Sequence, residues 1–192
     1  PQQLMAAERE IIEEAYAGDI IGLFDPGIFS IGDTLCAPGK KFQFDPIPTF
    51  APEHFKRVRS LDTMKRKQFL KGMEQIAQEG AIQIFKTPYT GMEEVIVGVV
   101  GTLQFDVLEY RLKNEYNVEL YMEGLPYEYL RWITTDDGEP VKEEDLILGT
   151  DVKLVEDYKG NQLLLFGSQW AVGWTQERNP NLTFHEFGGT QF

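Results

Sequence analysis

Strand-like and helix-like patterns alternate through the middle of the sequence, and their order constrains the fold more than any other feature. Four short segments rich in β-branched and aromatic residues are typical of strands. Two longer segments carry apolar residues at the spacing of one helical face. In chain order, these segments occupy residues 53–61, 62–80, 81–88, 94–101, 102–116 and 117–124. This β-α-β-β-α-β order predicts an α+β, ferredoxin-like (split βαβ) domain with both helices on one face of an antiparallel sheet.

The two predicted helices differ in their apolar patterns. The first has Asp62 as a plausible N-cap and Gly80 as a C-terminal stop. Its predicted buried side is formed by Met64, Phe69, Met73 and Ile76. The second has one stripe formed by Phe105, Leu108, Leu112 and Tyr116, and another formed by Leu103, Val107 and Tyr110. A helix that packs only on a sheet needs one stripe, so the second stripe meets either the C-terminal extension or a partner.

After Pro126 the alternation begins again. Strand patterns, a helix pattern with Ser168 as its N-cap and a last strand are expected at 129–135, 150–158, 161–167, 168–180 and 182–187. This region is too apolar to be a linker, so we expect an α/β extension that packs on the ferredoxin-like unit. The sequence does not indicate the role of its acidic segment, residues 136–145.

The first 47 residues have a different pattern, of short apolar segments broken by Gly, Asp and Pro. We predict strands at 9–16, 19–24, 28–35 and 40–44. A few such strands bury too little to be stable alone, so they need partner strands. The proline-rich segment 45–52 is the best candidate boundary. We therefore predict one domain over 1–47 and another over 48–192, with the ferredoxin-like unit at 48–126 and the extension at 127–192.

Composition predicts a globular, cytoplasmic protein and excludes several classes of site. The 192 residues are 42% hydrophobic, yet no apolar run has the roughly 18 to 20 residues needed to span a bilayer. The N-terminus lacks the pattern of a signal peptide. Cys36 is alone and fits a small core residue. With only His54 and His185 beside it, the sequence shows no metal-binding cluster and no catalytic triad.

The sequence also lacks the phosphate-binding loop that nucleotide hydrolysis requires. The glycine-rich turn "VGVVGT", residues 97–102, lies between a strand and a helix and could receive an anion. The alternative, which we favour, is a tight turn with close packing of the helix on the sheet.

The charge is unevenly distributed. The formal net charge is −13, yet nine of the 18 basic residues lie between Lys40 and Lys71, against three acidic ones. A basic surface of this kind can face phosphate while the rest of the protein repels it. The alternative is an ordinary solvated face.

Four segments resemble the translational GTPases. "EEAYAGDIIGLFDPGIFSIGDTLC" looks like the final strands of their β-barrel second domain. "FAPEHFKRVRSLDTMKRKQFLKGMEQIAQEGAIQIF" and "VVGTLQFDVLEYRLKNEYNVEL" are similar to their third domain. The segment "VVGTLQFDVLEYRLKNEYNVEL" closely resembles the bacterial peptide chain release factor 3 family. It does not resemble elongation factor G, whose equivalent helix begins with a Gly-Glu-Leu-His type motif. "WTQERNPNLTFHEF" resembles the C-terminus of that family.

The resemblance implies a C-terminal fragment of a ribosome-binding GTPase that promotes departure of the codon-reading release factors after peptide release. GTP and magnesium would then belong to an N-terminal domain, and this fragment would be neither catalytic nor membrane-bound. The implied partners are small-subunit ribosomal RNA and a small-subunit protein near the decoding centre. The truncated barrel could also self-associate. The rival hypothesis is a stand-alone ferredoxin-like domain that binds a small molecule or has a regulatory role.

The candidate site residues follow from the charge pattern and the second helix. The residues predicted to contact the ribosome are Lys56, Arg57, Arg59, Lys65, Lys67 and Lys71. Helical spacing directs Lys67 and Lys71 most clearly outward. The candidate interdomain or partner face is formed by Leu103, Val107 and Tyr110.

Overall fold

The computed structural model describes residues 2–188, except 6, 7, 27, 30, 46, 48 and 89–93. The chain divides into two compact units, Pro1–Ser30 and Ile31–Phe192. Within the described residues, no helix combines the length and the apolar character that crossing a bilayer requires.

The first unit contains one short hairpin. Its strands, β1 (Gln2–Met5) and β2 (Glu8–Ile11), pair antiparallel. The strands predicted at 19–24, 28–35 and 40–44 do not form in the described residues, where Gly22 makes only an isolated bridge. The physical reason is the absence of a partner strand in the described part of this chain, which leaves Ile20 87% and Phe24 91% exposed.

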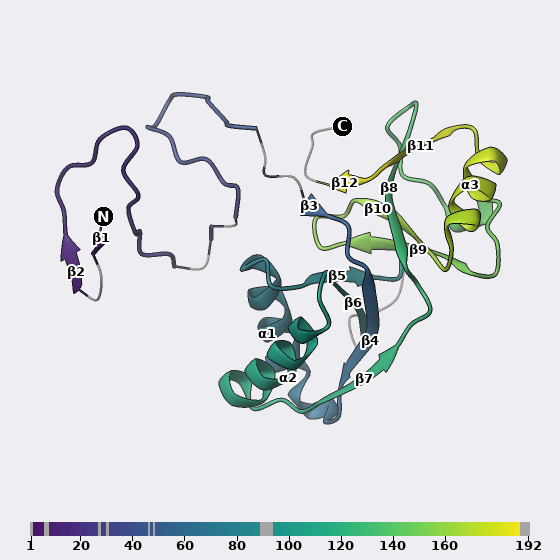
Figure 1. The fold of residues 1–192 in the computed structure, drawn as a ribbon, viewed down its shortest axis with the longest axis horizontal. Coiled ribbons are helices and arrows are strands. Elements are labelled where there is room, and N and C mark those ends of the chain that lie inside the picture. Colours follow the sequence, from purple (N-terminus) through teal and green to yellow (C-terminus); the bar gives the residue numbers. More distant parts are fainter. Residues whose placement is uncertain are drawn as a thin grey trace. The chain divides into compact units, whose positions relative to one another are not determined.

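The ferredoxin-like unit has the predicted element order. Its elements are β4 (His54–Ser60), α1 (Arg66–Gln78), β5 (Gln83–Lys86), β6 (Glu94–Val99), α2 (Leu103–Tyr116) and β7 (Leu120–Gly124). The strands lie in the order β5-β6-β4-β7, and every pair is antiparallel. Both helices cover the same face of this sheet (Figure 1). The α+β, split βαβ prediction is confirmed.

The C-terminal extension continues the same sheet. Its elements are β8 (Tyr129–Thr135), β9 (Val152–Asp157), β10 (Gln162–Phe166), α3 (Gln169–Arg178) and β11 (Leu182–His185). Strand β9 pairs with β5, which joins Phe85 to Asp157 and Lys86 to Glu156 in register. The result is one eight-stranded sheet in the order β11-β8-β10-β9-β5-β6-β4-β7. The extension therefore packs on the ferredoxin-like unit through backbone hydrogen bonds as well as side chains.

Four short elements complete the second unit. Strand β3 (Thr49–Phe50) pairs with β12 (Phe187–Gly188), which joins the segment before β4 to the end of the described chain. The 3-10 turns η1 (Thr63–Lys65) and η2 (Glu143–Asp145) precede α1 and β9.

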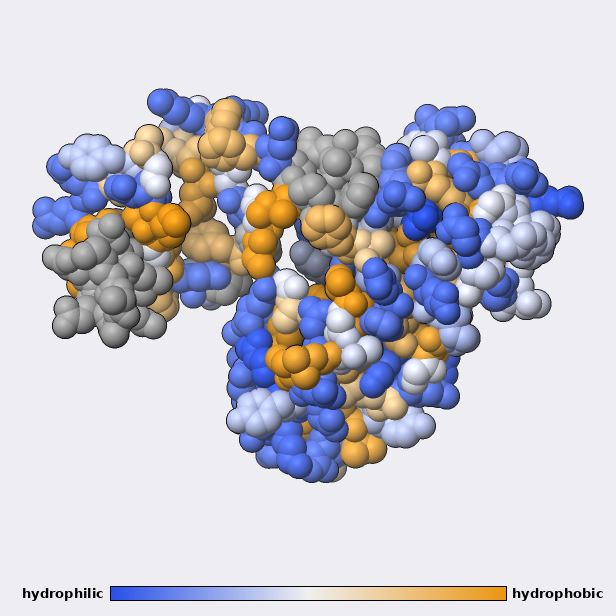
Figure 2. Space-filling view, in the orientation of Figure 1, coloured by the Kyte–Doolittle hydropathy of each residue, from blue (hydrophilic) through white to orange (hydrophobic). Residues whose placement is uncertain are grey.

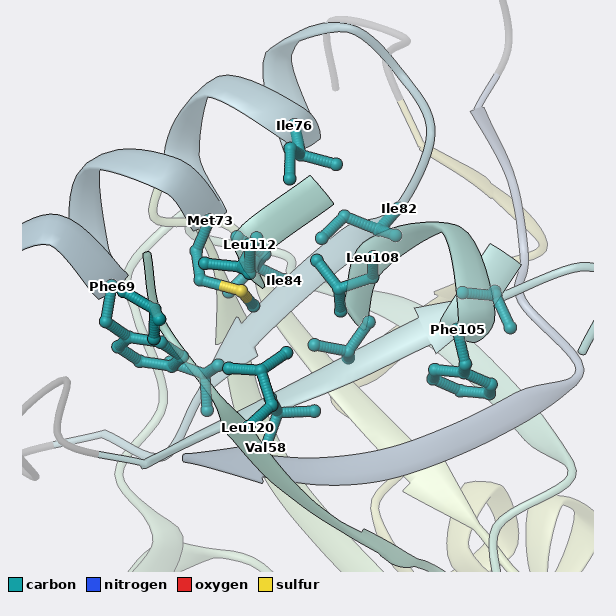
Figure 3. Close-up of a cluster of buried hydrophobic side chains, with 14 residues drawn as sticks. Val58, Phe69, Met73, Ile76, Ile82, Ile84, Phe105, Leu108, Leu112 and Leu120 are labelled. Atoms are coloured by element: carbon teal, nitrogen blue, oxygen red, sulfur yellow. The ribbon is translucent and has the colours of Figure 1, made fainter. Parts of the chain in front are cut away.

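Three groups of buried apolar side chains hold the sheet and helices together. The first lies between α1, α2 and the ferredoxin-like strands, and Figure 3 shows Phe69, Met73 and Leu112 pointing into it. The second lies on the other face, where Phe55 and Phe85 share a cluster with Trp132 of the extension. The third lies beneath α3. The first and third clusters therefore lie on the same side of the paired strands β5 and β9, and the second lies on the other side.

The first helical region begins and ends where predicted, with one correction. The Oδ1 atom of Asp62 accepts a hydrogen bond from the amide of Met64 at 2.9 Å, and Gly80 ends the helix with a φ of +77°. Met64 was predicted to be buried and is 90% exposed. The reason is that Met64 lies in η1, outside α1, so the 3.6-residue spacing of the helix does not apply to it.

Candidate functional site

The structure divides the six basic candidates between the two faces of the ferredoxin-like sheet. Side chains alternate along a strand, so Arg57 and Arg59 of β4 lie on the face opposite to buried Val58. Val58 packs on the cluster beneath α1 and α2. Lys65, Lys67 and Lys71 belong to η1 and α1 on the helical side. The six residues therefore do not form one continuous basic surface.

Both arginines of β4 interact with their cross-strand neighbours on β7. Arg57 is in register with Glu123, and its Nη1 lies 3.3 Å from Oε2 of that residue. Arg59 is in register with Tyr121, and its guanidinium lies 4.6 Å from the centre of that ring. Opposite partners on neighbouring strands stabilise a sheet. These two side chains therefore stabilise the pairing of β4 with β7, whether or not they also contact a partner molecule.

Lys56 and Lys65 also have partners within the described chain. The Nζ atom of Lys56 lies 4.5 Å from the centre of the Phe105 ring, at the start of α2. The Nζ atom of Lys65 donates a hydrogen bond of 2.7 Å to the backbone oxygen of Asn117. Asn117 ends α2 in the left-handed conformation, with a φ of +56°. Lys65 thus satisfies a carbonyl at the negative end of the helix dipole, which is a structural role.

Lys67 and Lys71 are the basic candidates that the fold leaves most available. Both are exposed, they stand four residues apart on α1, and neither forms an ion pair in the described part of the chain. Two like charges at this spacing repel each other slightly. The surface in Figure 2 is largely hydrophilic over the helical layer, with separate apolar patches. Local stability does not account for the two lysines.

The second apolar stripe of α2 remains exposed. The exposed fractions are 71% for Leu103, 44% for Val107 and 69% for Tyr110. The other stripe, Phe105, Leu108 and Leu112, is fully buried against the sheet and α1. Of the two alternatives for the exposed stripe, the described part of the C-terminal extension does not cover it. It therefore stays a candidate partner surface.

Two amides of the glycine-rich turn before α2, those of Val100 and Gly101, are bound within the chain and are not available to an anion. The side-chain oxygen Oε1 of Gln104 accepts hydrogen bonds from the amides of Val100 and Gly101, both at 3.0 Å. Its Nε2 donates to the oxygen of Ala81 at 2.7 Å. Gln104 therefore closes the turn from within the chain. The sequence did not single out this residue.

Two observations on the described residues bear on GTP and magnesium. The turn discussed above has no free amides of Val100 and Gly101 for phosphate, and the described chain contains no group of three or more His, Cys, Asp or Glu that could hold a metal ion. Magnesium is bound mainly through carboxylates, water and substrate phosphates.

Cys36 and the histidines have ordinary surroundings. Cys36 was expected in a core but is exposed, because the strand predicted before it does not form; its Sγ donates to the oxygen of Lys40 at 3.0 Å. His54 is exposed. His185 is half-buried, with Nε2 at 2.9 Å from Oγ1 of Thr134, and burial lowers its pKa below the ordinary value.

Two side-chain amides hold the acidic segment of the extension in place, and sequence reasoning did not identify them. Gln162 exchanges two hydrogen bonds with the backbone of Val141, at 2.7 and 2.8 Å. Asn179 does the same with the backbone of Ile147, at 2.9 Å each. The acidic turn η2 lies between these two points. It is therefore an ordered part of the surface, not a free loop.

The rival small-molecule hypothesis requires a hollow with convergent polar groups. A hollow of about 920 Å³ lies between β4, the start of α2 and the segment before β8. Its cations already have partners: Lys56 contacts Phe105, while Arg131 donates to the oxygen of Leu130 and to Glu186. Burial raises the pKa of Tyr127 in its wall above the ordinary value. The lysine and the arginine that line the hollow are therefore already engaged within the chain.

Comparison with known families gives a direct match. The model of the class II release factor RF3 C-terminal domain matches residues 44–176, which is more than half of the chain. The chain belongs to the release factor 3 family. A second model, elongation factor G domain 2, matches residues 1–38. The segment whose predicted strands do not form is therefore related to a domain of translational GTPases, as its motifs indicated.

Several members of the release factor 3 family are similar over nearly the whole chain. A peptide chain release factor 3 of Symbiobacterium thermophilum is 50% identical over 184 residues, which cover 96% of this chain and 34% of the relative. The corresponding protein of Gloeobacter violaceus is 44% identical with the same coverage. That of Listeria monocytogenes is 44% identical over 94% of this chain and 33% of the relative. The chain thus spans about a third of the length of these relatives.

Proposed function

We propose that this chain is the ribosome-docking region of a translation termination factor that promotes release of the codon-reading release factors after peptide release. The observation that carries the proposal is the match to the release factor 3 C-terminal domain over residues 44–176. Relatives named peptide chain release factor 3, at 44–50% identity over nearly the whole chain, support it. A cytoplasmic location goes with this role.

In this proposal the chain itself has no catalytic role. GTP and magnesium bind in a part of the family protein that the chain does not span. The closed turn at Gln104 supports this division, because two backbone amides that could contact phosphate are bound to a side chain. The second unit then acts as a docking body whose contacts with the small subunit respond to the nucleotide state elsewhere.

The contact surface centres on Lys67 and Lys71. Small-subunit ribosomal RNA is the partner of these lysines, because exposed ammonium groups without an internal carboxylate can neutralise phosphates. Leu103, Val107 and Tyr110 of α2 form an apolar contact with another domain of the protein or with a small-subunit protein near the decoding centre. Exposed apolar residues gathered on one helix face are typical of such contacts.

Ribosome binding of an intact release factor carrying Lys67→Glu and Lys71→Glu tests the proposal. We expect weaker binding and a shallower dependence of affinity on salt, with the logarithmic slope reduced by roughly 1.5–2 if two phosphate contacts are lost. Lys142→Glu with Lys159→Glu is the matched control, because it makes the same charge change on exposed lysines of the extension. If the Lys67→Glu, Lys71→Glu variant folds normally and has the same affinity and the same salt slope as the control variant, the proposed contact is contradicted.

Residues 11–47 are a further part of the proposal. Their exposed apolar side chains include Ile20, Phe24 and Phe42, and they are expected to pair with barrel strands from the same protein or from a second copy. The chain alone should then form dimers or larger species in sedimentation experiments. A strictly monomeric chain at high concentration would exclude pairing between copies.

A further inference from the structure

Helix α3 presents two tryptophans on its outer side. The indole rings of Trp170 and Trp174 are stacked, with centroids 6.2 Å apart and planes inclined by 28°. Trp170 is 72% exposed, and Trp174 is half-buried. Gly173 lies between them and is also exposed. We call Trp170, Gly173 and Trp174 the tryptophan surface.

The tryptophan surface is not needed to attach α3 to the sheet. The inward side of the helix consists of Ala171, Val172 and Thr175, which are all buried. The outward side has a glycine in the helix interior, where glycine lowers helix stability by about 1 kcal/mol relative to alanine. A Cβ atom at Gly173 would meet no atom within 4 Å, so packing inside the chain does not require the glycine. Close approach of a partner backbone beside the two stacked indoles would explain it.

The chain itself shows how a cation binds this surface. The guanidinium of Arg178, one turn after Trp174, lies 5.5 Å from the centre of that ring. A cation over an indole face is attracted by the ring quadrupole, and tryptophan is the strongest partner of this kind. In the described part of the chain, no cation lies over Trp170. Its exposed ring is therefore available to a cation from outside.

The surroundings of α3 are acidic and ordered. Segments 143–151 and 167–179 together carry five acidic residues and one basic residue. Asn179, at the end of α3, holds the backbone of Ile147 through two hydrogen bonds of 2.9 Å, which places the acidic turn η2 beside the helix. Ile147 is 53% exposed and adds apolar area there. An apolar patch with acidic surroundings complements a basic partner that also has apolar area.

We propose that the tryptophan surface binds a basic polypeptide segment, with an arginine or lysine of the partner on the ring of Trp170. Gly173 lets the partner backbone approach closely, and the acidic residues of η2 attract it. Nucleic acid does not fit, because its phosphates would meet acidic side chains. A second copy that pairs through the same surface does not fit either, since the acidic turns η2 of the two copies would repel each other. This inference goes beyond the proposed function, because it concerns a different surface and does not depend on phosphate contacts at α1.

The test uses the full chain and a dye-labelled synthetic peptide in which arginine and alanine alternate, with binding followed by fluorescence anisotropy. We expect saturable binding that changes the intrinsic tryptophan emission, since Trp132 is 3% exposed and buried away from solvent. Trp170→Ala should weaken binding roughly tenfold, as expected for loss of a cation–indole contact. Glu143→Gln with Glu144→Gln should weaken it and reduce its dependence on salt.

The control separates this surface from general attraction between an acidic protein and a basic peptide. Tyr158→Ala removes another exposed aromatic side chain, 51% exposed, from the turn after β9 and should leave peptide binding unchanged. Absence of binding, or an equal loss in the Trp170→Ala and Tyr158→Ala variants, would overturn the proposal. Binding of a uridine oligonucleotide that is lost in the Trp170→Ala variant would also overturn it, as would dimerisation of the chain that depends on Trp170.

Discussion

The two halves of the eight-stranded sheet cover their outer faces in different ways. In the ferredoxin-like half, α1 and α2 bury large side chains such as Phe69 and Leu112. In the extension, α3 buries only Ala171, Val172 and Thr175, and loop residues Leu146 and Leu148 complete the cover. The loop is held by side-chain amides. One half thus depends mainly on apolar area, and the other also depends on a few satisfied polar groups.

The largest expected effect comes from removing apolar area in the ferredoxin-like half. Phe69→Ala empties a fully buried site in α1 and should lower the free energy of unfolding by about 3–5 kcal/mol. Denaturant unfolding followed by circular dichroism measures this change. Met64→Ala is the control, because Met64 is 90% exposed just before the same helix. Similar losses in both variants would show that burial in this half does not dominate its stability.

A smaller loss is expected from a polar change in the extension. Asn179→Ala leaves the backbone N–H and C=O of Ile147 without their partner and should lower the free energy of unfolding by about 1–3 kcal/mol. Hydrogen exchange at Ile147 should also accelerate. Asn114→Ala serves for comparison, since Asn114 is exposed and donates only to the oxygen of Tyr110. If the two asparagine variants are equally stable, the extension does not depend on this amide.

A substitution one turn earlier in the same helix is expected to raise the free energy of unfolding, not to lower it. The hydroxyl of Thr175 is buried and makes no hydrogen bond with the described residues, although the residue is fully enclosed. Thr175→Val removes the unpaired hydroxyl while keeping the shape, and should raise the free energy of unfolding by about 1 kcal/mol. A higher midpoint in thermal unfolding would confirm this. A lower midpoint would mean that the hydroxyl has a stabilising partner, such as ordered water.

The smallest effect concerns the pH dependence of the extension. Burial lowers the pKa of His185 in the folded state, so the unfolded chain takes up this proton more readily. Stability from this group is therefore present above its unfolded pKa, about 6.5, and is lost as pH falls toward the folded pKa. His185→Gln should make thermal unfolding less sensitive to pH between about 7 and 5. An unchanged pH profile would assign the sensitivity to other groups.

Much of the ferredoxin-like half could be predicted from the sequence, because its information is local. The spacing of Phe69, Met73 and Ile76 identified the buried side of α1, and Asp62 and Gly80 identified the ends of the helical region. Met64 was misplaced because a 3-10 turn replaces the first turn of the helix. The candidate site was predicted less well. Strand periodicity alone could not show that Arg57 and Arg59 would pair with residues of β7, more than 60 positions away.

The sequence by itself determined the order of elements, the helix ends and the resemblance to translational GTPases, since each depends on residues that are close together in the chain. Only the tertiary structure decided that β9 joins β5 into a single sheet and that two side-chain amides fix the acidic segment. It also decided that residues 19–24 form no strand in this chain. A strand exists only when another strand satisfies its backbone hydrogen bonds, and apolar alternation does not specify that partner.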